Sequence, residues 1–155
     1  MKIAFYIGKG KIQDKFVRVW TKSKFSHCEL IINDISYSSS PRDHGVRKKL
    51  IDYDRQNWLI FNLKDTFDIN IALQFLNEKL GKKYDDLGII FSQVFNLDKQ
   101  DKNKYFCSEL IAECLKKAFK DLKTEKYFFS TENFNYYSPE RLYKYLKYIN
   151  LLSDV

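Results

Sequence analysis

Cysteine, histidine, glycine and proline are all scarce in this chain. Its 155 residues include three Cys, two His, five Gly and two Pro. Three cysteines cannot all pair within one chain, and there is no dense cysteine framework, so the pattern favours a reducing compartment over secretion. The stretch Gly8-Lys9-Gly10-Lys11 lacks the length and the ending of a phosphate-binding P-loop.

Long apolar runs are also missing. No stretch approaches the length that a membrane-spanning helix needs. The apolar segment at residues 1–8 is too short for a signal peptide, and lysines follow it too soon. We find no internal repeat and no low-complexity tract. These absences predict a cytoplasmic protein with one domain spanning residues 1–155.

What is present fits a folded domain with a basic surface. Hydrophobic residues make up 45% of the chain and aromatic residues 17%, which argues against disorder. The net charge of +7 comes mainly from lysines in short clusters such as Lys116-Lys117 and Arg47-Lys48-Lys49. Such a surface suits nucleic acid, anionic lipid or an acidic substrate, or simply confers solubility.

Hydrophobic periodicity divides the chain into a strand-rich half and a helix-rich half. Strands are expected at residues 2–7, 25–32, 35–38, 46–51 and 58–63, with a tight turn at Asn33-Asp34 and a loop at residues 38–45. Helices are expected at residues 12–22, 69–80, 85–95 and 106–120, and a last one opens at Ser138-Pro139-Glu140. Residues 121–137 form an aromatic-rich connector. The fold class predicted is α+β, with a small antiparallel sheet packed against helices.

Two short segments carry chemistry. Tyr105-Phe106-Cys107-Ser108-Glu109-Leu110 places a thiol at the start of a helix, where the dipole favours thiolate. In Ser26-His27-Cys28-Glu29-Leu30, His27 and Glu29 lie two residues apart on a strand, so they share a face while Cys28 points away. A thiol, an imidazole and a carboxylate are the parts of a nucleophilic acyl-transfer site.

In that interpretation His27 deprotonates Cys107, and backbone amides at the helix start contribute to an oxyanion hole. The competing interpretation is structural, because buried cysteines often act as small hydrophobes. A zinc site is disfavoured, because the spacing of His27, Cys28, Cys107 and Cys114 matches no common zinc pattern. His44 lies in a loop and is expected to be exposed.

Taken together, Ser-His-x-Glu-Leu in an early strand, Gly-Lys-x-Tyr-Asp at residues 81–85 and Tyr-Phe-Cys-Ser-Glu-Leu opening a helix resemble a known group of enzymes. They are similar to the permuted NlpC-type papain-like superfamily, whose relatives include YiiX-like hydrolases and the lecithin retinol acyltransferase group. In the permuted branch the histidine strand precedes the cysteine helix, as His27 precedes Cys107 here by 80 residues. The similarity spans about Phe16 to Tyr143, and Cys-Ser-Glu-Leu is its most specific part.

The resemblance implies a permuted papain-like fold with Cys107 as nucleophile and His27 as base. Enzymes of this superfamily often have their third catalytic residue, a polar one, on the strand after the histidine. Here residues 37–40 contain no His, Glu or Gln, so Glu29 is the candidate. Tyr84 matches a tyrosine near the active site of such enzymes. The residues assigned to the oxyanion or the substrate are Tyr84, Ser108, Ser39, Ser40 and Arg42, the arginine suiting an anionic or carboxylate-bearing substrate.

The function predicted is that of a cysteine hydrolase or acyltransferase acting on an amide, isopeptide or ester bond through a covalent thioester, without metal or cofactor. The partner expected is a peptide, isopeptide or acyl-bearing substrate. The alternative is a catalytically silent module that binds a protein or nucleic acid through basic and aromatic surface residues. Association with a membrane surface is a third possibility, although no strongly amphipathic basic helix is evident.

Overall fold

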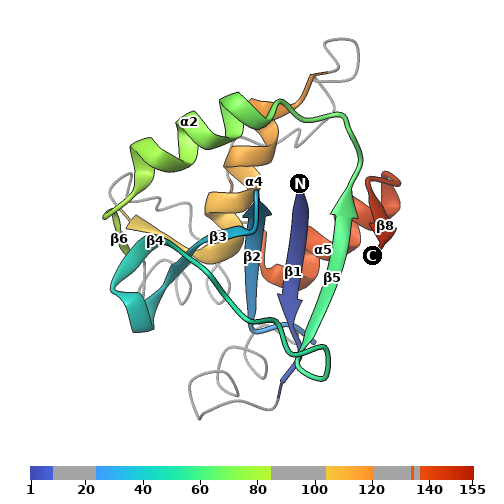
Figure 1. The fold of residues 1–155 in the computed structure, drawn as a ribbon, viewed down its shortest axis with the longest axis horizontal. Coiled ribbons are helices and arrows are strands. Elements are labelled where there is room, and N and C mark those ends of the chain that lie inside the picture. Colours follow the sequence, from blue (N-terminus) through green and yellow to red (C-terminus); the bar gives the residue numbers. More distant parts are fainter. Residues whose placement is uncertain (9–23, 85–103, 121–133, 135–136) are drawn as a thin grey trace.

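A mixed sheet forms the centre of the protein, with helices packed on it (Figure 1). The computed structural model describes residues 1–8, 24–84, 104–120, 134 and 137–155. The strands are β1 (Lys2–Tyr6), β2 (His27–Ile32), β3 (Ile35–Ser40), β4 (Gly45–Lys49), β5 (Trp58–Leu63), β6 (Lys83–Tyr84), β7 (Lys104–Tyr105) and β8 (Leu152–Asp154). The helices are α2 (Ile69–Lys79), α4 (Cys107–Ala118) and α5 (Pro139–Tyr148), with a 3-10 turn, η1 (Pro41–Asp43).

Strand order explains how distant segments meet. Six strands form a continuous antiparallel sheet in the order β4-β3-β2-β1-β5-β8, and the two-residue strands β6 and β7 extend it beyond β4. Only the β6–β7 pair is parallel among the described strands. The α+β class and an antiparallel sheet packed against helices are confirmed, with the short parallel β6–β7 pair as an addition at one edge. The three strands that sequence patterning missed are two or three residues long, too short to show alternation.

The β2–β3 hairpin follows from its turn residues. Asn33 and Asp34 both adopt positive φ, 50° and 62°, which a two-residue hairpin of this twist requires. The expected loop at 38–45 was partly wrong, because β3 continues to Ser40 and η1 follows it directly. Serines 36, 38 and 39 are fully buried in β3, and hydrogen bonds supply their hydroxyl groups with partners.

Helix α4 is the main helix of the core. It packs against β2, β3 and α2, and Figure 1 shows α4 and α5 behind the sheet. The fully buried residues Leu110, Ile111 and Leu115 join Leu30 and Ile3 of the sheet in one apolar cluster. Burying side chains of this size contributes roughly 1.5–3 kcal/mol each to the free energy of folding. This burial holds α4, and with it Cys107 at its first position, against the sheet.

Most predicted element boundaries agree with the structure to within two residues. Asp68 caps the start of α2, and Gly81 follows its end with φ of 80°. The helices predicted at 12–22 and 85–95, and the connector at 121–137 apart from Phe134 and Tyr137, lie outside the described residues. Within the described part of the chain, no helix combines the length and apolarity that a membrane crossing needs.

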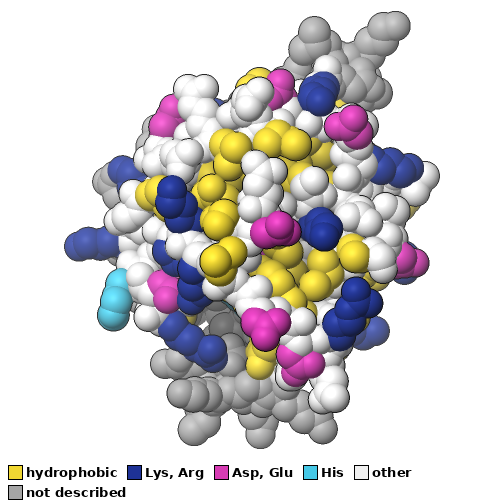
Figure 2. Space-filling view, viewed as in Figure 1, with side chains coloured by type: hydrophobic (Ala, Val, Ile, Leu, Met, Phe, Trp, Pro, Cys, Tyr) yellow, Lys and Arg dark blue, Asp and Glu magenta, His cyan; other side chains and the backbone are white. Residues whose placement is uncertain are grey.

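Lys and Arg side chains lie on the side of the molecule formed by β4 and β6 and also on the opposite side, with Asp and Glu side chains among them (Figure 2). Asp43 pairs with both Arg47 and Lys49. The basic cluster predicted at residues 47–49 is therefore partly neutralised by Asp43, which lies four residues before Arg47 and six before Lys49.

Candidate active site

Cys107 is the first residue of α4, and three hydrogen bonds fix the backbone around it. The Ser39 hydroxyl donates to the Tyr105 carbonyl at 2.6 Å, and the Ser108 hydroxyl donates to the Tyr137 carbonyl. The backbone N–H of Phe106 donates to the Glu109 carboxylate at 3.2 Å, which satisfies one donor at the helix start. The Cys107 sulfur thus has a fixed place at the positive end of the helix dipole.

His27 begins β2 and lies between the other two predicted site residues. Its Nε2 is 2.8 Å from Glu29 Oε1, and its ring is also a hydrogen-bond partner of Cys107. The His27 side chain is 19% exposed, whereas Glu29 and Cys107 are almost fully buried. The fold therefore brings together the thiol, imidazole and carboxylate that the sequence analysis grouped.

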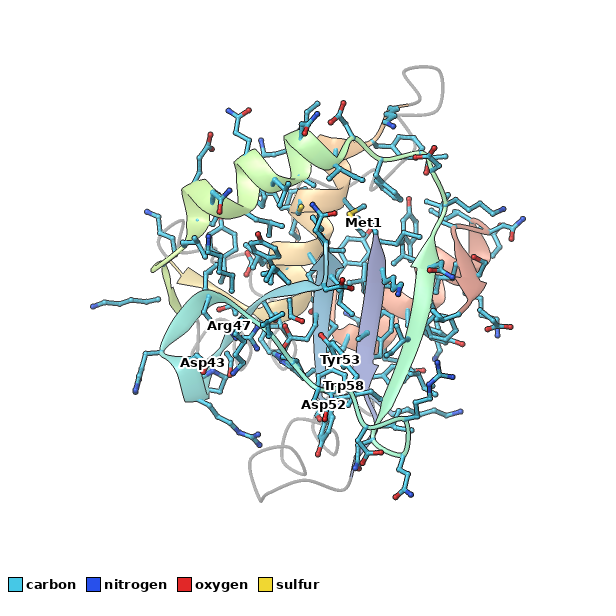
Figure 3. All side chains as sticks on the ribbon, viewed as in Figure 1. Met1, Asp43, Arg47, Asp52, Tyr53 and Trp58 are labelled. Carbon is cyan, nitrogen blue, oxygen red and sulfur yellow. The ribbon has the colours of Figure 1, made fainter. Side chains whose placement is uncertain are left out.

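Glu29 is held on its other side by Arg47, a residue that the sequence analysis placed only in a basic cluster. Arg47 Nη1 donates to Glu29 Oε2 at 2.7 Å and Nη2 donates to Oε1, so the contact is bidentate. Arg47 Nε donates to Asp43 Oδ2 at 2.8 Å, and Lys49 donates to both Asp43 oxygens. Figure 3 shows Arg47 and Asp43 side by side at the β4 edge.

The electrostatics favour a thiolate–imidazolium pair. Burial raises the pKa of Cys107, but hydrogen bonds from Cys28 and the charge of His27 outweigh it and lower the pKa to about 5. Burial lowers the pKa of His27, but the charges of Cys107 and Glu29 outweigh it and raise the pKa to about 10. Between these two pKa values Cys107 is deprotonated and His27 is protonated. The thiolate and the imidazolium attract each other, so this ion pair is the stable form at neutral pH.

Cys28 belongs to the site, which the sequence analysis did not expect. The alternation of β2 holds, because Cys28 lies in the apolar core together with Leu30. Even so, its thiol and its backbone N–H both donate to the Cys107 sulfur. The start of α4 meets the first two residues of β2, so groups from both faces of the strand reach the sulfur. The predicted alternation places Cys28 on the face opposite His27 and Glu29, but it gave no sign that Cys28 would still contact the Cys107 sulfur.

The residues predicted to bind substrate have varied surroundings. Ser39 and Ser108 are fully buried and donate to backbone carbonyls, and Ser40 accepts the Arg42 backbone N–H at 3.2 Å as the cap of η1. Arg42 is exposed on η1. The backbone of Tyr84 forms β6, but its side chain lies outside the described residues. Their contact with substrate or oxyanion stays a prediction.

Two aromatic residues that the sequence analysis did not single out lie near His27. The Trp58 ring is 6.3 Å from the His27 ring and 5.0 Å from Tyr53, both edge-on. The Tyr53 hydroxyl and the Ser36 hydroxyl are 2.7 Å apart. Figure 3 places Tyr53 and Trp58 together where β5 begins. The hydrophobic pattern had marked Trp58 as a strand residue, and nothing in it indicated contact with a strand more than 25 residues earlier.

Among the described residues, no group of three His, Cys, Asp or Glu side chains is arranged to hold a metal ion. Comparison of the chain with protein-family models and with curated proteins gives no match.

Proposed function

We propose that this protein is a cysteine-dependent acyl-transfer enzyme, a hydrolase or acyltransferase, with Cys107 as nucleophile, His27 as base and Glu29 as the orienting carboxylate. One observation carries the proposal: the His27 ring is a hydrogen-bond partner both of the Glu29 carboxylate, 2.8 Å from its Nε2, and of the Cys107 thiol. A base that is oriented by a third group is the arrangement that activates nucleophiles in enzymes.

The chemistry runs through two half-reactions. The Cys107 thiolate attacks the carbonyl carbon of an amide, isopeptide or ester, and the carbonyl oxygen becomes an oxyanion. Backbone N–H groups in the first turn of α4 are the candidate donors for that charge. The His27 imidazolium then gives a proton to the leaving amine or alcohol, and a thioester to Cys107 remains. Neutral His27 next takes a proton from water or another acceptor, which attacks the thioester and frees the thiolate.

The arrangement of elements supports a permuted papain-like fold as part of this proposal. The histidine strand β2 precedes the cysteine helix α4 in the chain, and the helix begins at the cysteine. Helix α4 packs directly on β2 and β3. These are the features on which the resemblance rests, with Glu29 in place of a polar residue on the following strand.

Access to the sulfur bears on the choice of substrate for a test. Cys107 is fully buried, and His27, at 19% exposure, is the most exposed of the three proposed catalytic residues. A small acyl donor is therefore the appropriate first probe. An activated aryl ester of acetate reports both acylation, by release of the coloured phenol, and the thioester, by the mass added to the protein.

The test is to incubate wild type, Cys107→Ala, His27→Ala and Cys114→Ala with this aryl acetate. Cys114 is a matched control because it is buried in the same helix and donates to the Ala72 carbonyl. We expect phenol release and an acetylated Cys107 peptide in wild type and in Cys114→Ala, and neither in Cys107→Ala. His27→Ala should hydrolyse the acetyl thioester at least about 100-fold more slowly, because it lacks the base that takes the proton from water.

Equal phenol release by wild type and Cys107→Ala would overturn the assignment of the nucleophile. No acylation of wild type by any small ester, together with an ordinary thiol pKa, would favour the catalytically silent binding module.

A further inference from the structure

Arg47 and Glu29 form a bidentate ion pair that is largely shielded from solvent. Glu29 is 1% exposed and Arg47 is 13% exposed, and the guanidinium meets both carboxylate oxygens. Planar bidentate geometry of this kind fixes the orientation of a carboxylate as well as its charge. Glu29 Oε1 is shared between Arg47 and His27, so the orientation set by Arg47 is passed directly to the imidazole.

We propose that Arg47 is a positioning residue, which holds the Glu29 carboxylate against His27 and thereby keeps the Cys107–His27 pair ionised. The inference rests on the proposed function, and it extends the site from three residues to four. Asp43 also holds the guanidinium in place, because its carboxylate accepts a hydrogen bond from Arg47 Nε, which does not contact Glu29.

The physical argument concerns what Glu29 would do alone. A buried carboxylate with a single partner is poorly solvated, and it takes up a proton more readily than one with several hydrogen bonds. Once protonated, Glu29 no longer stabilises the His27 imidazolium, and a neutral His27 no longer stabilises the Cys107 thiolate. Burial raises the pKa of Glu29, but His27 and, after it, Arg47 outweigh burial and lower that pKa below its ordinary value, so Arg47 helps to keep Glu29 ionised.

Other ionisable groups face Glu29 without changing the direction of this effect. Tyr53 approaches from the segment before β5, and burial raises its pKa, so it stays neutral in the acidic range. Cys28 on β2 is neutral there for the same reason. Lys49 and Asp43 lie beyond Arg47 and partly cancel each other. The charges that decide the ionisation of Glu29 are therefore those of His27 and Arg47.

The test follows the Cys107 thiolate directly by its ultraviolet absorbance between about pH 3 and pH 10, as the difference between each protein and its Cys107→Ala counterpart. This readout needs neither a substrate nor an open site. The variants are Arg47→Met, Arg47→Lys and, as control, Lys48→Met. Lys48 is the exposed neighbour of Arg47 on β4, so its variant removes the same charge without touching Glu29.

We expect the wild-type midpoint near pH 5. Arg47→Met should raise it by up to about one pH unit, because an opposite charge in contact with the Glu29 carboxylate shifts the pKa of that carboxylate by about one unit or more, and part of this shift reaches Cys107 through His27. Arg47→Lys keeps the positive charge but not the bidentate hydrogen bonding, and should raise the midpoint of the Cys107 titration by about 0.5 pH unit. Lys48→Met should leave it unchanged. The Arg47→Met effect should vanish in a Glu29→Gln background, because Arg47 acts through Glu29.

Three results would overturn the inference while leaving the proposed function intact: a low wild-type midpoint that Arg47→Met moves no further than Lys48→Met, a shift that persists in Glu29→Gln, or Arg47→Lys titrating like wild type. Arg47→Lys keeps the test decisive even if Arg47→Met fails to fold. A wild-type midpoint at the ordinary thiol pKa would instead refute the proposed function itself.

Discussion

Replacing His27 with alanine should convert Cys107 from a thiolate to an ordinary buried thiol. With a pKa of about 5, the wild-type sulfur is about three-quarters ionised at about pH 5.5 and almost fully ionised at about pH 8.5. A thiol with an ordinary pKa of about 8.5 is ionised to about one part in a thousand at the lower pH and about half ionised at the higher. Burial of Cys107 would raise its pKa further in the variant, so these figures are a lower limit to the contrast.

The rate at which Cys107 is alkylated at a single pH does not distinguish wild type from His27→Ala, because two effects of a low thiol pKa oppose each other. A thiolate of low pKa is a weaker nucleophile, and with a Brønsted slope of about 0.45 the lower pKa costs about 40-fold in intrinsic reactivity. At neutral pH that loss cancels the roughly 30-fold gain in ionised fraction. Wild type and variant would then react at similar rates although their chemistry differs.

The ratio of rates at two pH values removes both this compensation and the restricted access to a buried sulfur. We expect the rate of iodoacetamide labelling of Cys107 at about pH 5.5 to be ~0.8 of the rate at about pH 8.5 in wild type, and ~0.002 of it in His27→Ala. Site-resolved peptide mass spectrometry separates the three cysteines. Cys114, whose pKa is raised by burial, should remain unlabelled at both pH values and so report any unfolding.

Two outcomes would refute this reasoning. Ratios near 0.002 in both proteins would mean that the thiol is not activated at all. Ratios near 0.8 in both would mean that the helix dipole and Cys28 ionise Cys107 without help from His27.

Three further predictions test the surroundings of the site. Cys28→Ala removes a thiol donor to the sulfur and should raise the pKa of Cys107 by about one unit, as measured by thiolate absorbance; an unchanged pKa would leave Cys28 a packing role. Burial would raise the pKa of Glu29, but its partners lower it below its ordinary value of 4.5, so it stabilises the fold above that pH and less as pH falls. Glu29→Gln should therefore flatten the decline in the free energy of unfolding below about pH 4.5, measured by urea denaturation; an equal decline would contradict this. Gly45→Ala should lower that free energy by about 3 kcal/mol, because φ is 144° and the new Cβ would lie 1.9 Å from a backbone oxygen beside β6. Gly81→Ala, with positive φ but open space, should cost only about 1 kcal/mol, and equal costs would show that the close approach does not matter.

Local chemistry in the sequence was enough to predict most individual elements. The turn at Asn33-Asp34 needs residues that tolerate positive φ, and the helix start at Ser138-Pro139 combines a cap with a fixed proline φ. The apolar spacing of α4 identified its buried face and placed Cys107 at its first residue. Such signals lie within a few residues of one another, so they can be interpreted without knowledge of the fold.

Strand register was not accessible in this way. Arg47 reaches Glu29 because β3 lies between β2 and β4 and pairs with both, with Ser38 opposite Arg47. A slip of one residue in either pairing would turn the guanidinium to the other face of the sheet. In the sequence Arg47 is simply the first of three consecutive basic residues.

The sequence by itself therefore determined the α+β class, the strand that presents His27 with Glu29, and the thiol at the head of a helix. Each depends on periodicity or on a cap, which act over one or two turns of chain. Only the tertiary structure decided that the His27 imidazole lies between the Cys107 thiol and the Glu29 carboxylate, that Cys28 also donates to the sulfur, and that Arg47 forms a bidentate ion pair with Glu29. Those contacts join residues as many as 80 positions apart, and they exist because the sheet and α4 bury one common core.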